Sequence, residues 1–281
     1  MKFKPEWLPH LHRFRARELE MAFRDCPGKQ FVSGLELGAG DGFQSVLLSR
    51  YVTRLVSTDY DPAILRNEQT ETISYRTCDA ERVDRGFAPG EFDLVYSSNL
   101  LEHLSDLPRA LEAMRTVLAD DGLAIHIVPS PFWKICHLAL HVPNRILVIL
   151  ERLTGKGGVA AAIRKIKGSG QRAATIGRAD NNPKVSRRPR SSWSRMLVPE
   201  PHGAAAGHLE ELRMFRRSHW TRRFLQAGFS VVAIRKGPVA SGYGFGLDRL
   251  RRFLEGIGLT SEFIYVVVKK GTVSRHQSYF L

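Results

Sequence analysis

A short apolar run that ends in three alternating glycines constrains this chain more than any other feature. Residues 32–37 predict a buried strand, and Gly38, Gly40 and Gly42 follow it directly. Glycine permits tight, left-handed turns and lets the backbone approach a ligand closely. Residues 43–51 then predict a helix, whose first N–H groups are available to a ligand. Ligands of open α/β sheets sit beyond the carboxyl ends of the strands, so we expect a nucleotide-type cofactor at this loop.

Predicted strands and helices alternate along the chain. The spacing of apolar residues predicts helices at 5–26, 43–51, 62–68 and 105–118, and strands at 32–37, 54–58, 73–77, 92–96 and 122–128. After residue 208 it predicts a helix at 219–227 between a capping Ser218 and a terminating Gly228, strands at 229–235 and 263–268, and a helix at 247–254. This alternation indicates an α/β protein with a mostly parallel sheet that a late antiparallel pair closes.

Most of the net positive charge lies in one segment. The 281 residues carry a formal net charge of +14, and residues 154–195 hold eleven Lys and Arg against a single acid, Asp180. The segment is rich in Gly, Ala and Ser, which predicts a mobile loop or an insertion that becomes ordered on binding. Its charge favours anionic partners such as nucleic acid or an anionic membrane. A solvated loop without a partner is the alternative.

The cysteines, the N-terminal residues and one apolar segment indicate where in the cell the protein is expected. Cys26, Cys78 and Cys136 are widely spaced and form no zinc-binding pattern, which favours a reducing compartment. The N-terminal residues are too polar for a secretory signal, so we expect a cytoplasmic protein. Residues 132–150 are apolar but interrupted by charges and Pro143, so they predict a helical lid over the site or a segment lying in a membrane interface. Both could hold together, which would place the protein at the periphery of the inner membrane face.

Acidic residues follow the predicted strands. Glu36 precedes the first glycine by two positions, Asp59 ends the second strand, and Asp79 ends the third. A carboxylate at the end of the second strand can accept both hydroxyls of a ribose, and one at the third could accept from an adenine amine. Asp59 could instead cap a helix, and Asp79 could be a surface acid. A nicotinamide or flavin enzyme, or an ordinary strand-to-helix turn, would also explain the glycines alone.

Four motifs together resemble a known family. Glu36-x-Gly38-x-Gly40-x-Gly42, VSTDYDPAIL around Asp59, Cys78-Asp79-Ala80 and FDLVYSSNLLEHL are similar to the class I S-adenosylmethionine-dependent methyltransferases, in particular the small-molecule and quinone-type group. The resemblance covers roughly residues 30–130 and 208–270. It implies a Rossmann-like, seven-stranded, mostly parallel sheet with an antiparallel last strand and helices on both faces, and S-adenosylmethionine as the cofactor.

The resemblance also implies a domain organisation and a cofactor site. Residues 1–130 would form the cofactor-binding core, 131–207 a basic, partly flexible insertion or lid, and 208–281 the part that completes the same sheet. The glycines would pass beneath the methionine part of the cofactor, Asp59 would hold the ribose, and Ser97 would lie by the sulfonium. Nine residues are assigned to cofactor binding: Glu36, Gly38, Ala39, Gly40, Asp59, Tyr60, Asp79, Ala80 and Ser97.

A catalytic base is harder to predict. His103 follows the fourth strand and could take a proton from an acceptor hydroxyl, since imidazole titrates near neutrality. It could equally be a histidine that packs locally. His202, His208 and His219 show no metal-binding helix spacing, so we expect no metal site.

The regions that we expect to bind the methyl acceptor contain no recognisable motif. We expect methyl transfer to an oxygen of a small-molecule, lipid or glycan acceptor, with peripheral contact to an anionic membrane. The first alternative is an RNA methyltransferase that uses the basic insertion, although Ser97-Ser98-Asn99-Leu100 replaces the NPPY-type tetrapeptide after the fourth strand. The second is a non-catalytic scaffold that only binds S-adenosylmethionine.

Overall fold

The computed structural model describes residues 7–65, 69–154, 198–199, 201–203 and 205–281. The basic segment 154–195 lies outside them except for Thr154. The described helices and strands, in chain order, are α1 (Trp7–Ala22), β1 (Phe31–Leu37), α2 (Phe43–Leu48), β2 (Val52–Asp59), β3 (Ile73–Thr77), η1 (Ala80–Arg85), β4 (Phe92–Ser98), η2 (Leu101–His103), α3 (Leu107–Val117), β5 (Leu118–Pro129), α4 (Pro131–Thr154), α7 (His208–Met214), α8 (Arg217–Gln226), β6 (Phe229–Lys236), α9 (Asp248–Gly256), β7 (Glu262–Lys269) and η4 (Gln277–Tyr279).

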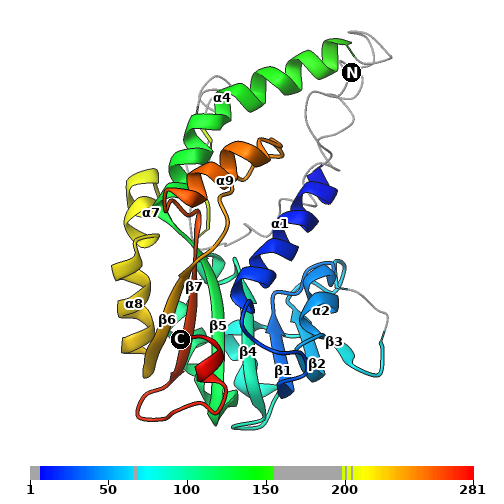
Figure 1. Ribbon diagram of the computed structural model, residues 1–281, viewed down its shortest axis with the longest axis vertical. Coiled ribbons are helices and arrows are strands. Elements are labelled where there is room, and N and C mark those ends of the chain that lie inside the picture. The colour runs from blue at the N-terminus through cyan, green and yellow to red at the C-terminus, as the bar shows by residue number, and fades with distance from the viewer. Residues whose placement is uncertain (1–6, 66–68, 155–197, 200, 204) are drawn as a thin grey trace.

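The seven strands form one sheet in the order β3-β2-β1-β4-β5-β7-β6 (Figure 1). The first five run parallel to one another, and β7 is antiparallel to both β5 and β6. The chain order reverses between β1 and β4, which is the switch point where α/β sheets bind ligands. The predicted Rossmann-like fold is therefore confirmed.

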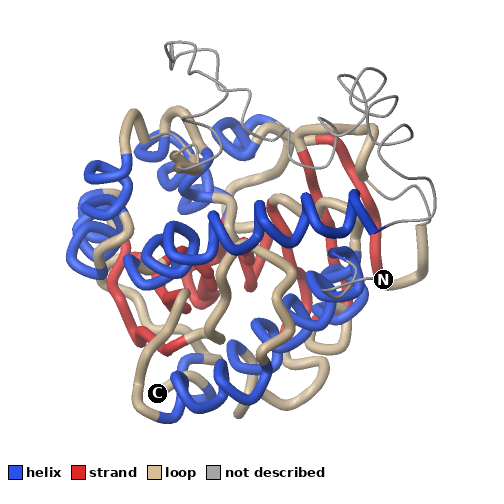
Figure 2. The backbone as a smooth tube through the Cα atoms, turned by 90° about the horizontal axis from the view of Figure 1, so that it is seen from above, coloured by secondary structure: helices blue, strands red, loops and turns tan. Residues whose placement is uncertain are grey.

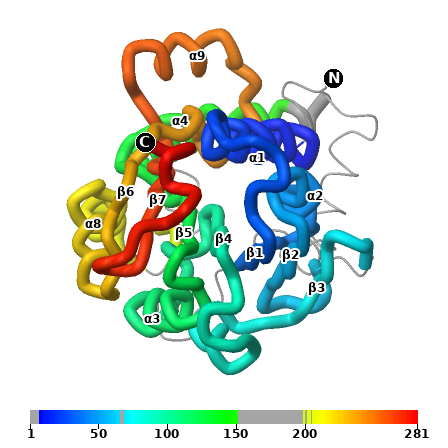
Figure 3. The backbone as a smooth tube through the Cα atoms, turned by 60° about the horizontal axis from the view of Figure 1, so that its bottom comes forward, coloured from blue at the N-terminus to red at the C-terminus, as the bar shows by residue number. Residues whose placement is uncertain are grey.

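Both faces of the sheet are covered, because successive strand residues point to opposite sides. On β4 and β5, Val95 and Ala124 belong to a core formed with α3 and α8, whereas Tyr96 and Ile125 belong to a core formed with the end of α1, α2 and the C-terminal segment. Figure 3 shows α3 and α8 on one side of the strands and α1 and α2 on the other. This accounts for the burial of every residue of β4 and of residues 122–129 of β5.

Three helices cover the carboxyl ends of the parallel strands. α4 begins directly after β5, and β6 runs parallel to β5 and leads toward α9 at the same edge. Together with α1 they lie over one end of the sheet (Figures 1 and 2). Among the described residues, no helix combines the length and apolar character needed to cross a bilayer. Helices from both halves of the chain thus cover the carboxyl ends of the strands, where ligands of such sheets bind.

Two local predictions were wrong, and two short helices were missed. Residues 62–65 form turns and no helix, because the carboxylates of Asp59 and Asp61 accept hydrogen bonds from the backbone two residues ahead. Residues 66–68 of that predicted helix lie outside the described residues. Ser218 is not the cap of α8, since the helix begins at Arg217 and places it in the first turn. The helices η1 and α7 were not predicted, because short segments show little periodicity.

Candidate functional site

The glycine loop adopts the left-handed geometry that its sequence predicts. Gly38, Gly40 and Gly42 have φ angles of 78°, 55° and 74°. The N–H groups of Gly38 and Ala39 both donate to the carbonyl of Thr58 on β2, at 2.8 and 2.9 Å. A Cβ on Gly40 would meet no atom within 4 Å, so the backbone at this position borders open space. The loop is therefore fixed to the neighbouring strand while one face stays accessible.

Asp59 holds the tip of this loop. Its Oδ2 accepts the N–H of Gly40 at 2.9 Å, and its Oδ1 accepts the N–H of Asp61 at 3.0 Å. Carboxylate oxygens can accept more than one hydrogen bond, so both can still receive a ligand hydroxyl. The Tyr60 side chain is 77% exposed beside it and offers a free aromatic face. Asp59 and Tyr60 thus lie where the sequence predicts the nucleoside part of the cofactor.

Glu36 lies behind the loop rather than on its surface. Its Oε2 accepts hydrogen bonds from the hydroxyls of Ser45 on α2 and Ser57 on β2, at 2.5 and 2.7 Å. The side chain is buried, and this burial raises its pKa to about 7 despite the two hydroxyl donors. Glu36 therefore ties β1, β2 and α2 together beneath the glycines.

Asp79 and Ala80 begin η1 at the end of β3. The Asp79 carboxylate accepts the N–H of Glu81 at 2.9 Å and so caps this short helix. Ala80 is buried against the core around α3. The sequence offered a surface acid as the alternative for Asp79 and did not predict this capping role, and its contact with adenine stays a prediction.

Ser97 is directed into the interior of the protein. It is fully buried, and its hydroxyl pairs with Nδ1 of His126 on β5 at 2.8 Å. Burial lowers the pKa of His126 to about 3, which keeps the imidazole neutral. A side-chain contact between Ser97 and a sulfonium would require this pair to open, so its predicted role stays untested.

A buried polar network at the end of β4 was not predicted. Arg15 on α1 donates to both carboxylate oxygens of Glu18 and to the hydroxyl of Ser98, at 2.8–2.9 Å. Asn99, with φ of 49°, donates to Glu262 at 3.0 Å. Burial first, and then the charge of Glu18, raises the pKa of Glu262 well above its usual range. This network ties α1 and β7 to the switch point.

His103 belongs to a second cluster beside the same edge. Its Nε2 lies 3.8 Å from a carboxylate oxygen of Glu102, and its ring packs edge-on against that of His202 with centroids 4.5 Å apart. Trp133 of α4 lies 4.9 Å from the His202 ring. The histidine is therefore neither isolated nor simply exposed, and it shares its surroundings with a second imidazole and a buried carboxylate.

Comparison with known proteins agrees with this geometry. Residues 35–126 match a family described as "Methyltransferase domain". The arginine-hydroxylase NDUFAF5, mitochondrial, of Danio rerio is 35% identical over 98 residues, and that of Homo sapiens is 32% identical over 102. These matches cover 34% and 36% of this chain and 30% and 29% of the relatives, so less than a third of each relative is matched.

Two solved structures share the fold over most of the chain. The first is described as the complex between the Haloferax volcanii Trm112 methyltransferase activator and the putative methyltransferase, with a TM-score of 0.56 and 12% identity over 93% of both chains. The second is a putative S-adenosylmethionine-dependent methyltransferase from Listeria monocytogenes, with a TM-score of 0.51 and 14% identity over 91% of this chain and 98% of that one. Residues 35–126 thus form a methyltransferase domain, and the chain shares the fold of S-adenosylmethionine-dependent methyltransferases. The predicted family and cofactor class are thereby confirmed.

The residues of this methyltransferase site fit S-adenosylmethionine. Gly40 faces open space at its Cα, Asp59 retains acceptor capacity, and Tyr60 presents an exposed ring. These three lie at the carboxyl ends of β1 and β2, next to the switch point. The assignment of the nine individual cofactor contacts stays a prediction.

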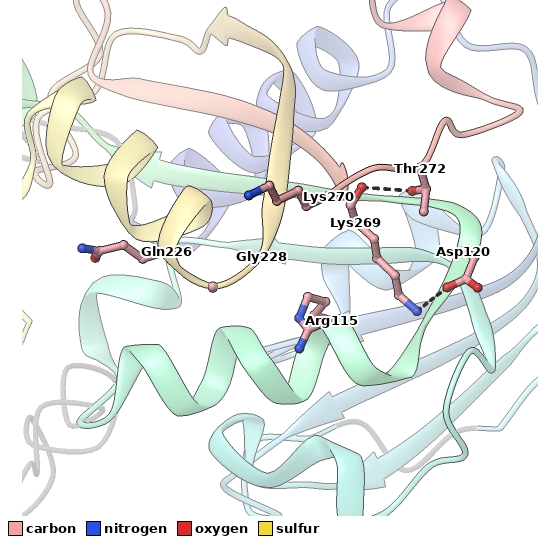
Figure 4. A pocket seen from close by; sticks show the side chains of 8 residues that line it. Arg115, Asp120, Gln226, Gly228, Lys269, Lys270 and Thr272 are labelled. Atoms are coloured by element: carbon pink, nitrogen blue, oxygen red, sulfur yellow. Dashed lines mark hydrogen bonds and ion pairs between the residues drawn. The ribbon is translucent and has the colours of Figure 1, made fainter.

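A pocket of about 500 Å³ lies at the opposite edge of the sheet and is separate from this site. Figure 4 shows Arg115 from α3, Asp120 from the beginning of β5, and Lys269 and Lys270 from the end of β7 around it. Lys269 pairs with Asp120 at 2.8 Å. Since none of its lining residues comes from the glycine loop or the neighbouring strand ends, the pocket does not contribute to the methyltransferase site.

Proposed function

We propose that this protein transfers the methyl group of S-adenosylmethionine to an oxygen of a small-molecule, lipid or glycan acceptor. The observation that carries the proposal is the hydrogen bond between Asp59 and Gly40, which holds an open, left-handed loop at the carboxyl edge of the sheet. The family match supports the donor. The acceptor would enter between this loop and the helices α1, α4 and α9, which cover the carboxyl ends of the parallel strands.

The sulfonium of the bound cofactor supplies an electrophilic methyl group, so the chain's residues mainly align the acceptor and exclude water. α1 contributes to exclusion, because Arg15 and Glu18 seal it to Ser98. His103 would receive the proton of an acceptor hydroxyl. His103 follows Leu100 by three residues. The Leu100 side chain lies against the glycine loop, since a Cβ on Gly38 would be 3.2 Å from it.

The character of α9 favours an acceptor at an anionic membrane. Leu250, Phe253 and Ile257 at this helix are 50%, 63% and 62% exposed. Arg249 directly precedes Leu250, and Arg252 directly precedes Phe253. An amphipathic helix with apolar and basic side chains is typical of interfacial binding. We propose that α9 and the exposed apolar residues of α4 contact the membrane. A lipid-linked acceptor would then lie close to the carboxyl ends of the parallel strands.

A methyl-transfer screen tests this function. The protein would be incubated with tritiated S-adenosylmethionine and fractionated lipid, glycan, small-molecule and RNA pools, with Asp59→Ala as the control. We expect label in the lipid, glycan or small-molecule pool, and none with the variant. Label in RNA would support the basic insertion as an RNA-binding element. Binding of S-adenosylhomocysteine without label in any pool would favour a scaffold.

A further inference from the structure

We propose that Glu102, His103 and His202 form a binding site for a divalent transition-metal ion. Each residue offers one ligand atom, and these three atoms all lie within 4.8 Å of one another. Two imidazoles and one carboxylate suit zinc, iron(II) or cobalt(II) and leave positions open for an outside ligand. The sequence did not predict this site, because His202 is about a hundred residues from the other two ligands.

The carboxylate of Glu102 is the strongest indication of a missing positive partner. Its side chain is 1% exposed, and neither of its oxygens has a hydrogen-bond partner among the described residues. Burying a carboxylate in this state is costly unless it is protonated, paired or bound to a metal. Among the described residues, the His103 imidazole is its ion-pair partner if protonated, and the 3.8 Å between them is longer than a hydrogen bond. A divalent ion between the three groups would compensate the buried charge.

The segment that carries His202 is built to lie against Glu102. Gly203 has a φ of 66°, and a Cβ there would lie 2.4 Å from the Glu102 carbonyl oxygen, so only glycine permits this approach. The His202 N–H donates to Glu211 at 3.1 Å, and Glu211 pairs with the buried Lys134 of α4 at 2.6 Å. Backbone packing and a buried ion pair thus hold His202 in place independently of its ring.

The spacing allows coordination after small side-chain adjustments. Metal–nitrogen and metal–oxygen bonds are about 2.0–2.2 Å, so two ligand atoms on one ion are typically about 3–4 Å apart. The three atoms here are already within 4.8 Å. Rotation about the side-chain torsions of His103 and His202 would close the remaining distance, because both residues are partly exposed.

The position of the ion would give it a role in catalysis, and this step rests on the proposed function. His103 lies in η2 at the end of β4, on the same edge as the glycine loop. An acceptor oxygen bound to the ion would lose its proton more readily, because a metal lowers the pKa of a bound hydroxyl. In the metal-free protein His103 would take this proton; with the ion bound, His103 would be a ligand and the proton would pass to solvent water.

Metal binding can be measured without any methyl transfer. Untagged, metal-free protein would be titrated with Co²⁺ and with Zn²⁺, by absorption and by calorimetry. We expect one ion per chain and visible cobalt bands that Zn²⁺ abolishes. The variants Glu102→Gln, His103→Ala and His202→Ala should each weaken binding at least about tenfold, because each loses one of three protein ligands. His219→Ala, in α8 and outside the cluster, should bind as the wild type does.

Two controls keep the proposal separate from folding and from the proposed function. Thermal unfolding should show Glu102→Gln folded, since the amide replaces an unpaired buried carboxylate with a neutral group of the same shape. S-adenosylhomocysteine should still bind to all three variants, so a defect in the cofactor site would be distinguishable. Folded wild-type protein that binds neither ion, or binding that survives all three substitutions, would overturn the metal site.

Discussion

The Asp59 carboxylate accepts a hydrogen bond from the backbone N–H of Gly40, over 2.9 Å. The residue that the sequence assigns to the ribose therefore also fixes the loop that is predicted to pass beneath the cofactor. Strands β1 and β2 are paired in parallel register, Leu37 beside Thr58, so their carboxyl ends bring these two residues together. One side chain thus links the position of the glycine loop to the nucleoside end of the site.

Asp59→Ala should weaken binding of S-adenosylhomocysteine by about 10- to 100-fold, because hydrogen bonds to a charged group contribute about 1.5–3 kcal/mol. Isothermal titration calorimetry measures this change. Asp61→Ala is the matched control, since Asp61 also accepts a backbone N–H two residues ahead, at 2.9 Å. Equal affinities for the two variants would show that Asp59 does not contact the ligand.

Gly40→Ala should abolish cofactor binding through the new methyl group rather than through instability. The control is Gly271→Ala: both glycines have positive φ, 55° and 85°, and at both a Cβ meets nothing within 4 Å. Each substitution should destabilise the fold by about 1–2 kcal/mol, the strain of a left-handed alanine. Of these two glycines only Gly40 belongs to the predicted cofactor loop, so Gly271→Ala should bind S-adenosylhomocysteine normally. A similar loss of affinity in both variants would contradict the assignment.

Glu36 should make stability depend on pH. Burial raises its pKa in the folded state from 4.5 to about 7. Below about pH 4.5 both states hold the proton, and between 4.5 and 7 only the unfolded state releases it, so stability falls as pH rises through this window. Glu36→Gln removes this dependence. Its stability relative to the wild type should rise by about 3 kcal/mol from pH 4.5 to pH 7.

Urea unfolding at several pH values between 4.5 and 8 measures this difference. Comparing the variant with the wild type cancels the contributions of the other buried carboxyls, Glu102 and Glu262, whose pKa values are also raised. A constant difference across the range would show that Glu36 has an ordinary pKa in the folded protein.

The sequence could predict the glycine loop and the acids at the strand ends, because both follow from local patterns. β3 begins and ends at the predicted residues, and β1 differs by one. The helix expected at 62–68 was wrong, since Asp59 and Asp61 use their carboxylates in turns instead of leaving them free to cap. Side-chain competition of this kind is invisible to hydrophobic periodicity.

The polar residues at the switch point could not be predicted, because distant segments assemble them. Glu18 and Glu262 are brought to β4 by α1 and β7, although they are far apart in the sequence. His202 reaches His103 through the packing of Gly203 against Glu102 and through the hydrogen bond from its own N–H to Glu211. A single sequence places neither pair, since such contacts depend on topology and on one glycine's close approach.

The ion pair between Lys134 and Glu211 should be required for α4 to dock. Both side chains are fully buried, and their charged atoms lie 2.6 Å apart. Lys134→Met should lower the free energy of unfolding by about 3–5 kcal/mol, because it removes the ammonium that compensates the charge of the buried Glu211 carboxylate. The double variant Lys134→Met/Glu211→Gln should recover more than half of this loss, since the amide removes the charge while still accepting the His202 N–H. Lys269→Met, which breaks the surface pair with Asp120, should have little effect. Chemical denaturation of the three variants measures these differences. A double variant no more stable than Lys134→Met would show that the lost stability comes from packing and not from the charge of Glu211.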